Sequence, residues 1–469
     1  MTQQKPDPDT LPPLDAKIHR GLSKLIPGDI VRLERQQRWR PAWDAQIVAG
    51  DSVMDVNVRA EKGENYIGPM SLSQEAKVHH ILEKHGIPVP HVHGMLENPP
   101  AYVMDLLPGQ INLATAESDA ARASIRRQYI ETLANMHRIP LDEFAAIGLD
   151  IPTGPRETAL NLYAPCERIY RQRMAGRPFA LMEFIWRWVQ RNVPEHRDRA
   201  AFISADSGQF LFQGDRLTGL IDFEVAYVGD PLAEFAGMRL RDSAEPLGDI
   251  NTLMDHYEAL TGDKLDKQSV EYHTAGFCAV NGFLLWPLAF DPAPDDDYVA
   301  YLSFSVGTSR WAISAIAENL ELTLPAVDEP EPAPVAFPAG GAHMVNTLDR
   351  LEVAGDFGRY ELSKARSLAL YLDRMNRYGR AIIDADLDDA AQVLGDRPAS
   401  PEAAEEALVS FIQDAGSAED RQLARYFHRW LGRRDFILAG CGDSAWLTGF
   451  DLQKIERRQA DRGKEQTAS

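Results

Sequence analysis

The stretch ISADSGQFLFQGDRLTGLIDFEVAYVGDP, residues 203–231, contains two apolar runs with acidic residues near their ends. Residues 210–212 and 217–221 are apolar enough to be buried strands, and the QGD between them is typical of a turn. In an antiparallel hairpin the start of the first strand lies beside the end of the second. The pattern therefore predicts that Asp206 and Asp222 lie close together in the fold.

Carboxylates placed in this way suit a metal site. Two buried carboxylates repel each other, so such a pair usually needs a cation. Gln209 adds a neutral oxygen ligand nearby, and two carboxylates with an amide oxygen suit Mg²⁺. Phosphoryl transfer needs a metal that bridges phosphates and a base that aligns the acceptor hydroxyl. Aspartates are also common at strand ends and turns, so the hairpin alone leaves both interpretations open.

The composition narrows the class of protein. The chain has 469 residues, 44% of them hydrophobic and 25% charged, which is typical of a soluble globular protein with roughly three domains. A net charge of −21 argues against a nucleic-acid binder, because such proteins usually present a basic face. The three cysteines, Cys166, Cys278 and Cys441, are too far apart for a zinc motif and odd in number, so we expect a reducing cytoplasm.

No segment of the sequence predicts a membrane location. The N-terminus is polar and proline-rich and has no apolar run typical of a signal peptide. The longest apolar stretch, residues 276–290, is interrupted by Asn281 and Pro287 and is too short to span a bilayer. A buried helix is the better interpretation of that stretch.

The order of expected elements divides the chain into five parts. After a disordered tail at 1–15, residues 16–107 show short β segments around one helix that begins at Ser71 or Ser73, and residues 108–323 are mostly helical. Residues 324–341 are rich in proline, glycine and acidic residues, as linkers are. Residues 342–469 are expected to form a helical domain with a polar tail.

Residues 25–325 resemble the aminoglycoside phosphotransferase and choline kinase-like family, a branch of the protein-kinase-like fold. That family carries HGDxxPGN, then an apolar hairpin, then ID[WF]E and GDP; here residues 217–239, LTGLIDFEVAYVGDPLAEFAGMR, match the second half. The resemblance implies an α+β, bilobal protein-kinase-like fold with a small β-rich lobe that binds nucleotide and a helical lobe that binds substrate. The C-terminal helical domain would be an addition to it.

The resemblance also implies roles for residues around the hairpin. Asp222 would hold Mg²⁺ on the nucleotide phosphates, and Gln209 takes the position of the family's metal-binding asparagine. Asp206 resembles the catalytic aspartate that orients the acceptor hydroxyl, if SAD at 204–206 is aligned with HGD. An alignment without a gap would instead put Ser204 at the catalytic position, but the first alignment is preferred because residues 201–203, AFI, then supply the expected apolar strand directly before the triplet.

Further roles are implied for the small lobe. Arg59 resembles the cation that pairs with phosphates, and Glu75 resembles the helix residue that holds this cation in one pose. The segment AYVMDLLPG, residues 101–109, resembles the hinge, so the backbone at Met104, Asp105 and Leu106 would contact adenine.

The phosphate-covering turn departs from the family pattern. No glycine occurs from Asp29 to Ala49, although glycine lets backbone amides approach phosphates closely. Arg38 or Arg40 would have to contact phosphate through the side chain, or both are simply solvated.

We therefore expect a cytoplasmic phosphotransferase that uses ATP and Mg²⁺ and acts on the hydroxyl of a small molecule. Neither nucleic acid nor membrane is expected as a partner, and the aromatic stripe at 426–431 is interpreted as core or as a homo-oligomer contact. Because the HGD-type loop is degenerate, a non-catalytic pseudokinase that binds nucleotide or a partner protein as a scaffold is the alternative.

Overall fold

The computed structural model describes residues 5–36, 40–61, 68–294, 296–335, 338–442, 447 and 450–456. The chain forms two compact units. The first consists of Met1–Pro152, Arg199–Glu234 and Glu245–Asp263, and the second of Thr153–Asp198, Phe235–Ala244 and Lys264–Ser469.

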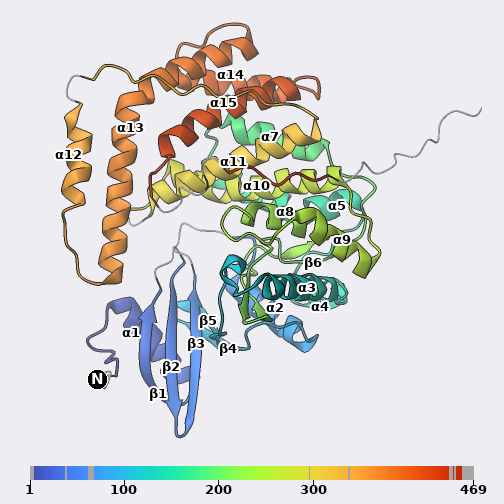
Figure 1. Ribbon diagram of the computed structural model, residues 1–469, viewed down its shortest axis with the longest axis vertical. Helices are drawn as coiled ribbons and strands as arrows, with labels where there is room; N and C mark the ends of the chain where they lie inside the picture. Colours follow the sequence, from blue (N-terminus) through green and yellow to red (C-terminus); the bar gives the residue numbers. More distant parts are fainter. Residues whose placement is uncertain are drawn as a thin grey trace, which may run out of the picture. The chain divides into compact units, whose positions relative to one another are not determined.

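The first unit contains a five-stranded antiparallel sheet in the order β1-β2-β3-β5-β4 (Figure 1). All five strands lie in the segments that the sequence predicted. The strands are β1 (Asp29–Arg35), β2 (Ala42–Ala49), β3 (Ser52–Ala60), β4 (Val92–Glu97) and β5 (Pro100–Asp105). Its helices are α1 (Pro13–Leu25), α2 (Leu72–Lys84), η1 (Leu113–Thr115), α3 (Asp119–Met136), α4 (Leu141–Ala146) and α9 (Ile250–Thr261).

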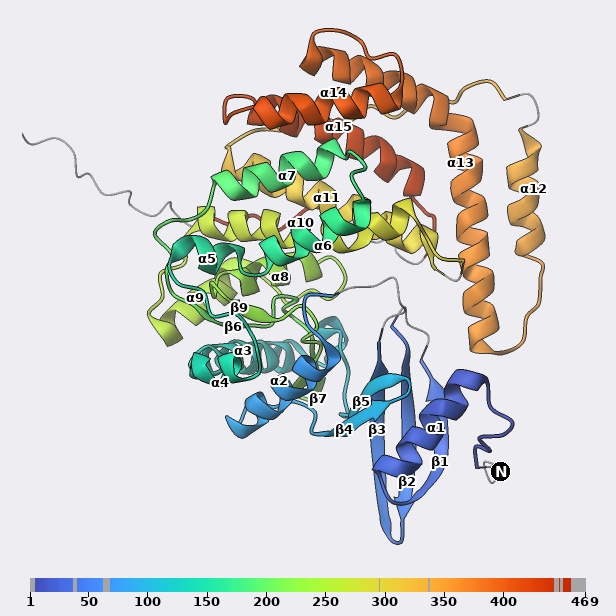
Figure 2. The same cartoon turned by 180° about the vertical axis from the view of Figure 1, so that it is seen from behind.

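Helix α1 lies against the sheet, as Figure 2 shows from behind. Its residues Ile18 and Leu22 are buried in one apolar cluster with Trp43 and Val58 of the sheet. The predicted disordered tail at 1–15 is therefore wrong at its end, because α1 already begins at Pro13. Proline suits this first helical position, since its fixed backbone angle matches the helix and its missing N–H would have no partner there.

Helix α2 begins at the first of the two predicted caps. The Ser71 side chain accepts a hydrogen bond from the Gln74 N–H, and the Gln74 side chain accepts one from the Ser71 N–H. This reciprocal pair satisfies two of the N–H groups that every helix start leaves open. It fixes where α2 starts and so which of its residues face the sheet; Glu75, in the first turn, is buried.

Residues 203–231 are held by two short antiparallel strand pairs. They are β6 (Ala201–Ile203) with β9 (Tyr227–Gly229), and β7 (Phe210–Gln213) with β8 (Arg216–Leu220). At Gly109 the chain after β5 passes very close to β7, because a Cβ at this position would lie 2.4 Å from the Phe212 carbonyl oxygen. Gln110 and Phe212 then exchange backbone hydrogen bonds, so the predicted hinge is fixed to the hairpin.

The second unit is helical. Its helices are α5 (Pro155–Leu160), α6 (Tyr163–Met174), α7 (Ala180–Arg191), α10 (Lys267–Phe290), α11 (Tyr298–Asn319), α12 (Ala339–Leu348), α13 (Gly355–Leu394), α14 (Pro401–Asp414) and α15 (Asp420–Leu438). Helix α8 (Ala233–Arg241) starts at the end of a segment of the first unit and continues into the second. The apolar stretch at 276–290 lies in α10, as predicted, and its cysteine, like the other two, is buried and free.

The structure confirms the predicted mixed α and β fold class, with a β-sheet N-terminal region, a helical remainder and extra C-terminal helices. The division into parts differs from the predicted one. Helices α12 to α15 belong to one compact unit with α10 and α11, whereas the sequence predicted a separate domain at 342–469. Within the described ranges, no helix is long and apolar enough to cross a membrane.

Candidate active site

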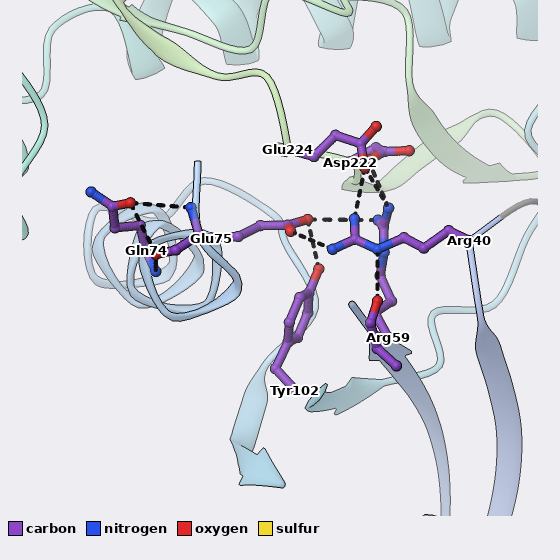
Figure 3. Close-up of polar contacts among 9 residues, drawn as sticks. Arg40, Arg59, Gln74, Glu75, Tyr102, Asp222 and Glu224 are labelled. Atoms are coloured by element: carbon purple, nitrogen blue, oxygen red, sulfur yellow. Dashed lines mark hydrogen bonds and ion pairs between the residues drawn. The ribbon is translucent and has the colours of Figure 1, made fainter. Parts of the chain in front are cut away.

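Three of the predicted site residues meet in a buried charge cluster in the first unit (Figure 3). Arg59, near the end of β3, donates a hydrogen bond to Asp222 Oδ1 at 2.8 Å. Its guanidinium also lies 3.8 Å from Glu75 Oε1 of α2, so the predicted ion pair between Arg59 and Glu75 is present. The shorter contact is with Asp222, the residue expected to hold a metal ion.

Two further charged residues complete the cluster, which we call the five-residue charge cluster: Arg40, Arg59, Glu75, Asp222 and Glu224. Arg40 lies just before β2 and forms ion pairs with Glu75 at 3.0 Å and Glu224 at 2.7 Å. Sequence reasoning named Arg40 only as one of two arginines that would either contact phosphate through the side chain or be solvated, and its burial excludes the second alternative for Arg40. The other, Arg38, lies outside the described residues.

The charges in the cluster stabilise one another against burial. Burial alone would raise the pKa of Glu75, but Arg59 and Arg40 outweigh it and the pKa of Glu75 is lowered. Burial likewise opposes the charge of Arg59, yet Asp222 and the other acidic partners hold its pKa well above the ordinary value. Tyr102 of β5 donates a hydrogen bond to Glu75 at 2.8 Å and fixes that carboxylate further. Glu75 and the two arginines are therefore charged at neutral pH.

The loop between β6 and β7 holds the predicted catalytic residue. Asp206 is half-buried, and its carboxylate accepts a hydrogen bond from the Gln209 amide at 2.7 Å. The backbone carbonyl of Gln209 in turn accepts a hydrogen bond from the backbone N–H of Ile221, the residue before Asp222. Asp206 is thus linked through Gln209 to Ile221 at the end of the hairpin, one residue before Asp222.

Two residues of this region have a positive backbone angle φ, which is unfavourable for residues other than glycine. Ala205 has φ +63° and Asp222 has φ +68°. Such angles cost about 1–3 kcal/mol each and tend to occur at functional sites. In the alignment of SAD with HGD, Ala205 takes the position of the family's glycine, which adopts this region freely. The backbone therefore supports the alignment that puts Asp206, rather than Ser204, at the catalytic position.

A fully buried carboxylate that sequence reasoning missed holds the same loop. Glu234, in the first turn of α8, accepts hydrogen bonds from the Ser204 N–H at 2.8 Å, the Ser204 hydroxyl at 2.7 Å and the Ser207 hydroxyl. The ring of His137 also contacts this carboxylate, with Nε2 at 3.3 Å, and its Nδ1 lies 2.7 Å from the Tyr257 hydroxyl. A signal was present, because Glu234 is an acidic residue in an otherwise apolar run directly after GDP.

The predicted hinge is largely committed to the sheet. Met104 is buried and pairs with both β3 and β4. The N–H of Asp105 donates to the His91 carbonyl and the N–H of Leu106 to the Asp55 carbonyl. Neither N–H is available to adenine in this arrangement, so a contact at Asp105 or Leu106 would have to use a carbonyl or side-chain atom.

The chemistry of the donors decides whether a metal ion fits. Among the described residues, no group of three or more His, Cys, Asp or Glu could hold a metal ion by itself. Mg²⁺ is usually bound by one or two carboxylates together with substrate phosphates, so a complete protein cage is not required. Asp222 and Gln209, joined through Ile221, offer oxygen ligands of that kind, and the residues present fit Mg²⁺ carried by a nucleotide.

Comparison with known proteins adds to this picture. Residues 67–266 match the model of the phosphotransferase enzyme family. A comparison with curated proteins found no match.

Solved structures with a similar arrangement come from phosphotransferases. One is a Ralstonia eutropha protein classed provisionally as an aminoglycoside phosphotransferase (15% identity, 66% of this chain and 98% of that chain, TM-score 0.48). Another is the macrolide 2′-phosphotransferase MphH from Brachybacterium faecium (16%, 59% and 93%, TM-score 0.42). A third is the ternary complex of streptomycin, ATP and APH(2″)-IIa (16%, 58% and 91%, TM-score 0.42). The match of residues 67–266 to this family model confirms the resemblance predicted from the residues around Asp222.

Proposed function

We propose that the chain transfers the γ-phosphoryl group of ATP to the hydroxyl of a small molecule, with Mg²⁺, in the cytoplasm. The observation that carries the proposal is the position of Arg59, which lies between Glu75 of α2 and Asp222 at the end of the hairpin. A cation held in this way by two carboxylates from separate elements is oriented to meet an anionic group. The neighbouring loop supplies a half-buried carboxylate, Asp206, that can meet a hydroxyl.

Each residue then has a role. Asp222 and Gln209 would hold Mg²⁺, which neutralises phosphate charge when bound. Arg59 would contact the phosphates and Glu75 would keep it in place. Asp206 would align the acceptor hydroxyl and accept its proton as the hydroxyl oxygen bonds to the γ-phosphorus and the bond to the β–γ bridging oxygen breaks.

Nucleotide titration by calorimetry, with and without Mg²⁺, tests the nucleotide site. The wild type should bind ATP more tightly with Mg²⁺, and Asp222→Ala should remove this dependence on Mg²⁺, because the carboxylate ligand is gone. Asp215→Ala is the matched control, since Asp215 is an exposed aspartate in the turn of the same hairpin. If the wild type does not bind ATP at millimolar concentration, the proposal fails and the scaffold alternative becomes the better account.

Replacement of the proposed base tests the transfer step separately. Asp206→Asn should abolish turnover of ATP with an acceptor hydroxyl, because the amide cannot take the proton, while MgATP affinity stays within about twofold. Steady-state kinetics and calorimetry on the same preparation measure both quantities. Normal turnover in Asp206→Asn would show that Asp206 is not the base.

A further inference from the structure

The proposed function assigns no role to two residues of the five-residue charge cluster, Glu224 and its ion-pair partner Arg40. Its guanidinium is buried and makes three contacts. Nε donates to the Ala60 carbonyl at 3.2 Å, one terminal nitrogen donates to Glu75 at 3.0 Å, and the other to Glu224 at 2.7 Å. The first two contacts fix the plane of the guanidinium within the sheet region, and the third directs its remaining end towards the hairpin.

The position of Arg40 in the chain is as informative as its contacts. It lies at the end of the connection between β1 and β2, the segment in which the kinase-like pattern expects a glycine-rich turn over the phosphates. This connection contains no glycine. Backbone amides flanked by side chains approach phosphate less closely, whereas a guanidinium offers five donors in a planar fork that matches phosphate oxygens.

The composition of the cluster indicates which contact of Arg40 can be exchanged. Two arginines face three carboxylates, which corresponds to a formal net charge of −1. Glu75 is retained by Arg59 and Tyr102 as well as by Arg40. Glu224 is more exposed, with 19% of its side chain accessible against 2% for Glu75, and is therefore the partner that Arg40 can exchange at lower cost.

From these contacts we infer that Arg40 is a second phosphate-binding residue, which exchanges Glu224 for the terminal phosphates of the nucleotide and replaces the missing glycine-rich turn. The inference rests on the proposed function, because it needs a nucleotide at this site. It adds a residue-specific claim: affinity through Arg40 depends on the number of phosphates and not on the base or ribose.

A series of ligands that differ only in phosphate number tests the inference. Calorimetry of Arg40→Gln should show MgATP affinity reduced about 10- to 100-fold, as expected for lost hydrogen bonds between charged groups, with a smaller loss for MgADP. Adenosine affinity should stay within about twofold. Arg32→Gln is the control: Arg32, on β1, pairs with Glu34 and Asp55 nearer the surface, and its loss should change no affinity.

The outcomes distinguish this inference from the proposed function. If the wild type binds MgATP and Arg40→Gln binds it equally well, Arg40 is no phosphate ligand and only this inference is overturned. Equal losses for MgATP and adenosine would show that Arg40 supports the fold alone. If the wild type binds no MgATP, both proposals fail. Should Arg40→Gln not fold, as thermal unfolding will show, Arg40→Lys makes the same comparison, with an intermediate loss for MgATP and none for adenosine.

Discussion

Among single residues, Glu75 is notable because its carboxylate is charged although it is almost completely buried. Its side chain is 2% exposed, forms ion pairs with two arginines and accepts a hydrogen bond from a tyrosine hydroxyl. Removing one member of a buried charge network is costly, because the remaining charges stay buried without compensation. Glu75 thus contacts Arg59 and stabilises the cluster as an ionised group, so its contribution to stability should depend on pH.

The variant Glu75→Gln should lower the free energy of unfolding at pH 7 by roughly 3–5 kcal/mol. The pKa of Glu75 is lowered in the folded protein, despite burial, by Arg59 and Arg40. The ordinary pKa of a glutamate, 4.5, applies to the unfolded chain. As pH falls below this value the unfolded chain takes up the proton first, and the stabilisation of the wild type is lost progressively until pH falls through the lowered pKa of the folded state. The difference between wild type and variant should therefore shrink from pH 7 to pH 4.

Urea unfolding at pH 7, 5 and 4 measures this difference. Glu97→Gln, at the exposed end of β4, is the control and should stay within about 0.5 kcal/mol of the wild type at each pH. A difference for Glu75→Gln that stays constant, or grows as pH falls, would contradict the ionised cluster.

At the scale of elements, local sequence signals were sufficient for some features and not for others. The five strands lie in a region where short β segments were predicted, and the start of α2 was narrowed to Ser71 or Ser73; the signals for both act within a few positions. The pairing of β7 with β8 followed from a short turn. Arg40 and Glu224 are 184 positions apart, and Ser204 and Glu234 are 30 apart, so neither contact leaves a local periodic signal.

The loop between β6 and β7 illustrates that limit. Its degenerate sequence left open whether Ser204 or Asp206 is catalytic, and only its anchorage shows that Ser204 is turned inward, onto Glu234. The roles of Asp206, Gln209, Arg59 and Asp222 remain predictions until binding and turnover are measured.

Because Glu234 anchors that loop, Glu234→Gln should affect turnover more than nucleotide affinity. An amide presents only one acceptor atom to three donors from Ser204 and Ser207, so unfolding free energy should fall by about 1–3 kcal/mol. Urea unfolding, kcat and the MgATP Kd measured together test this. Glu117→Gln, exposed before α3, is the control. Unchanged stability would show that Glu234 does not hold the loop.

At the scale of the whole molecule, the question is whether the C-terminal helices are an appendage or part of a core. The sequence predicted a separate domain after a linker, because residues 324–341 have a linker composition. In the second unit, however, Phe427 of α15 stacks on Phe184 of α7 with ring centroids 5.5 Å apart, and both are buried. Arg191 of α7 also forms an ion pair with Asp420 of α15. Segments on both sides of the linker therefore share one core.

Phe427→Ala should consequently destabilise the whole second unit. Truncating a buried phenylalanine removes its transfer free energy and leaves a cavity, so unfolding free energy should fall by about 3–5 kcal/mol. Phe357→Ala is the matched control: Phe357, on α13, is 55% exposed, and its loss should cost no more than about 0.5 kcal/mol. Hydrogen exchange of the backbone amides of α7 in increasing urea follows that helix alone, whereas tryptophan fluorescence would also report Trp430 of α15. If α15 were an independent domain, Phe427→Ala would leave that signal unchanged; a common shift to lower urea would show that α7 and α15 unfold as one core.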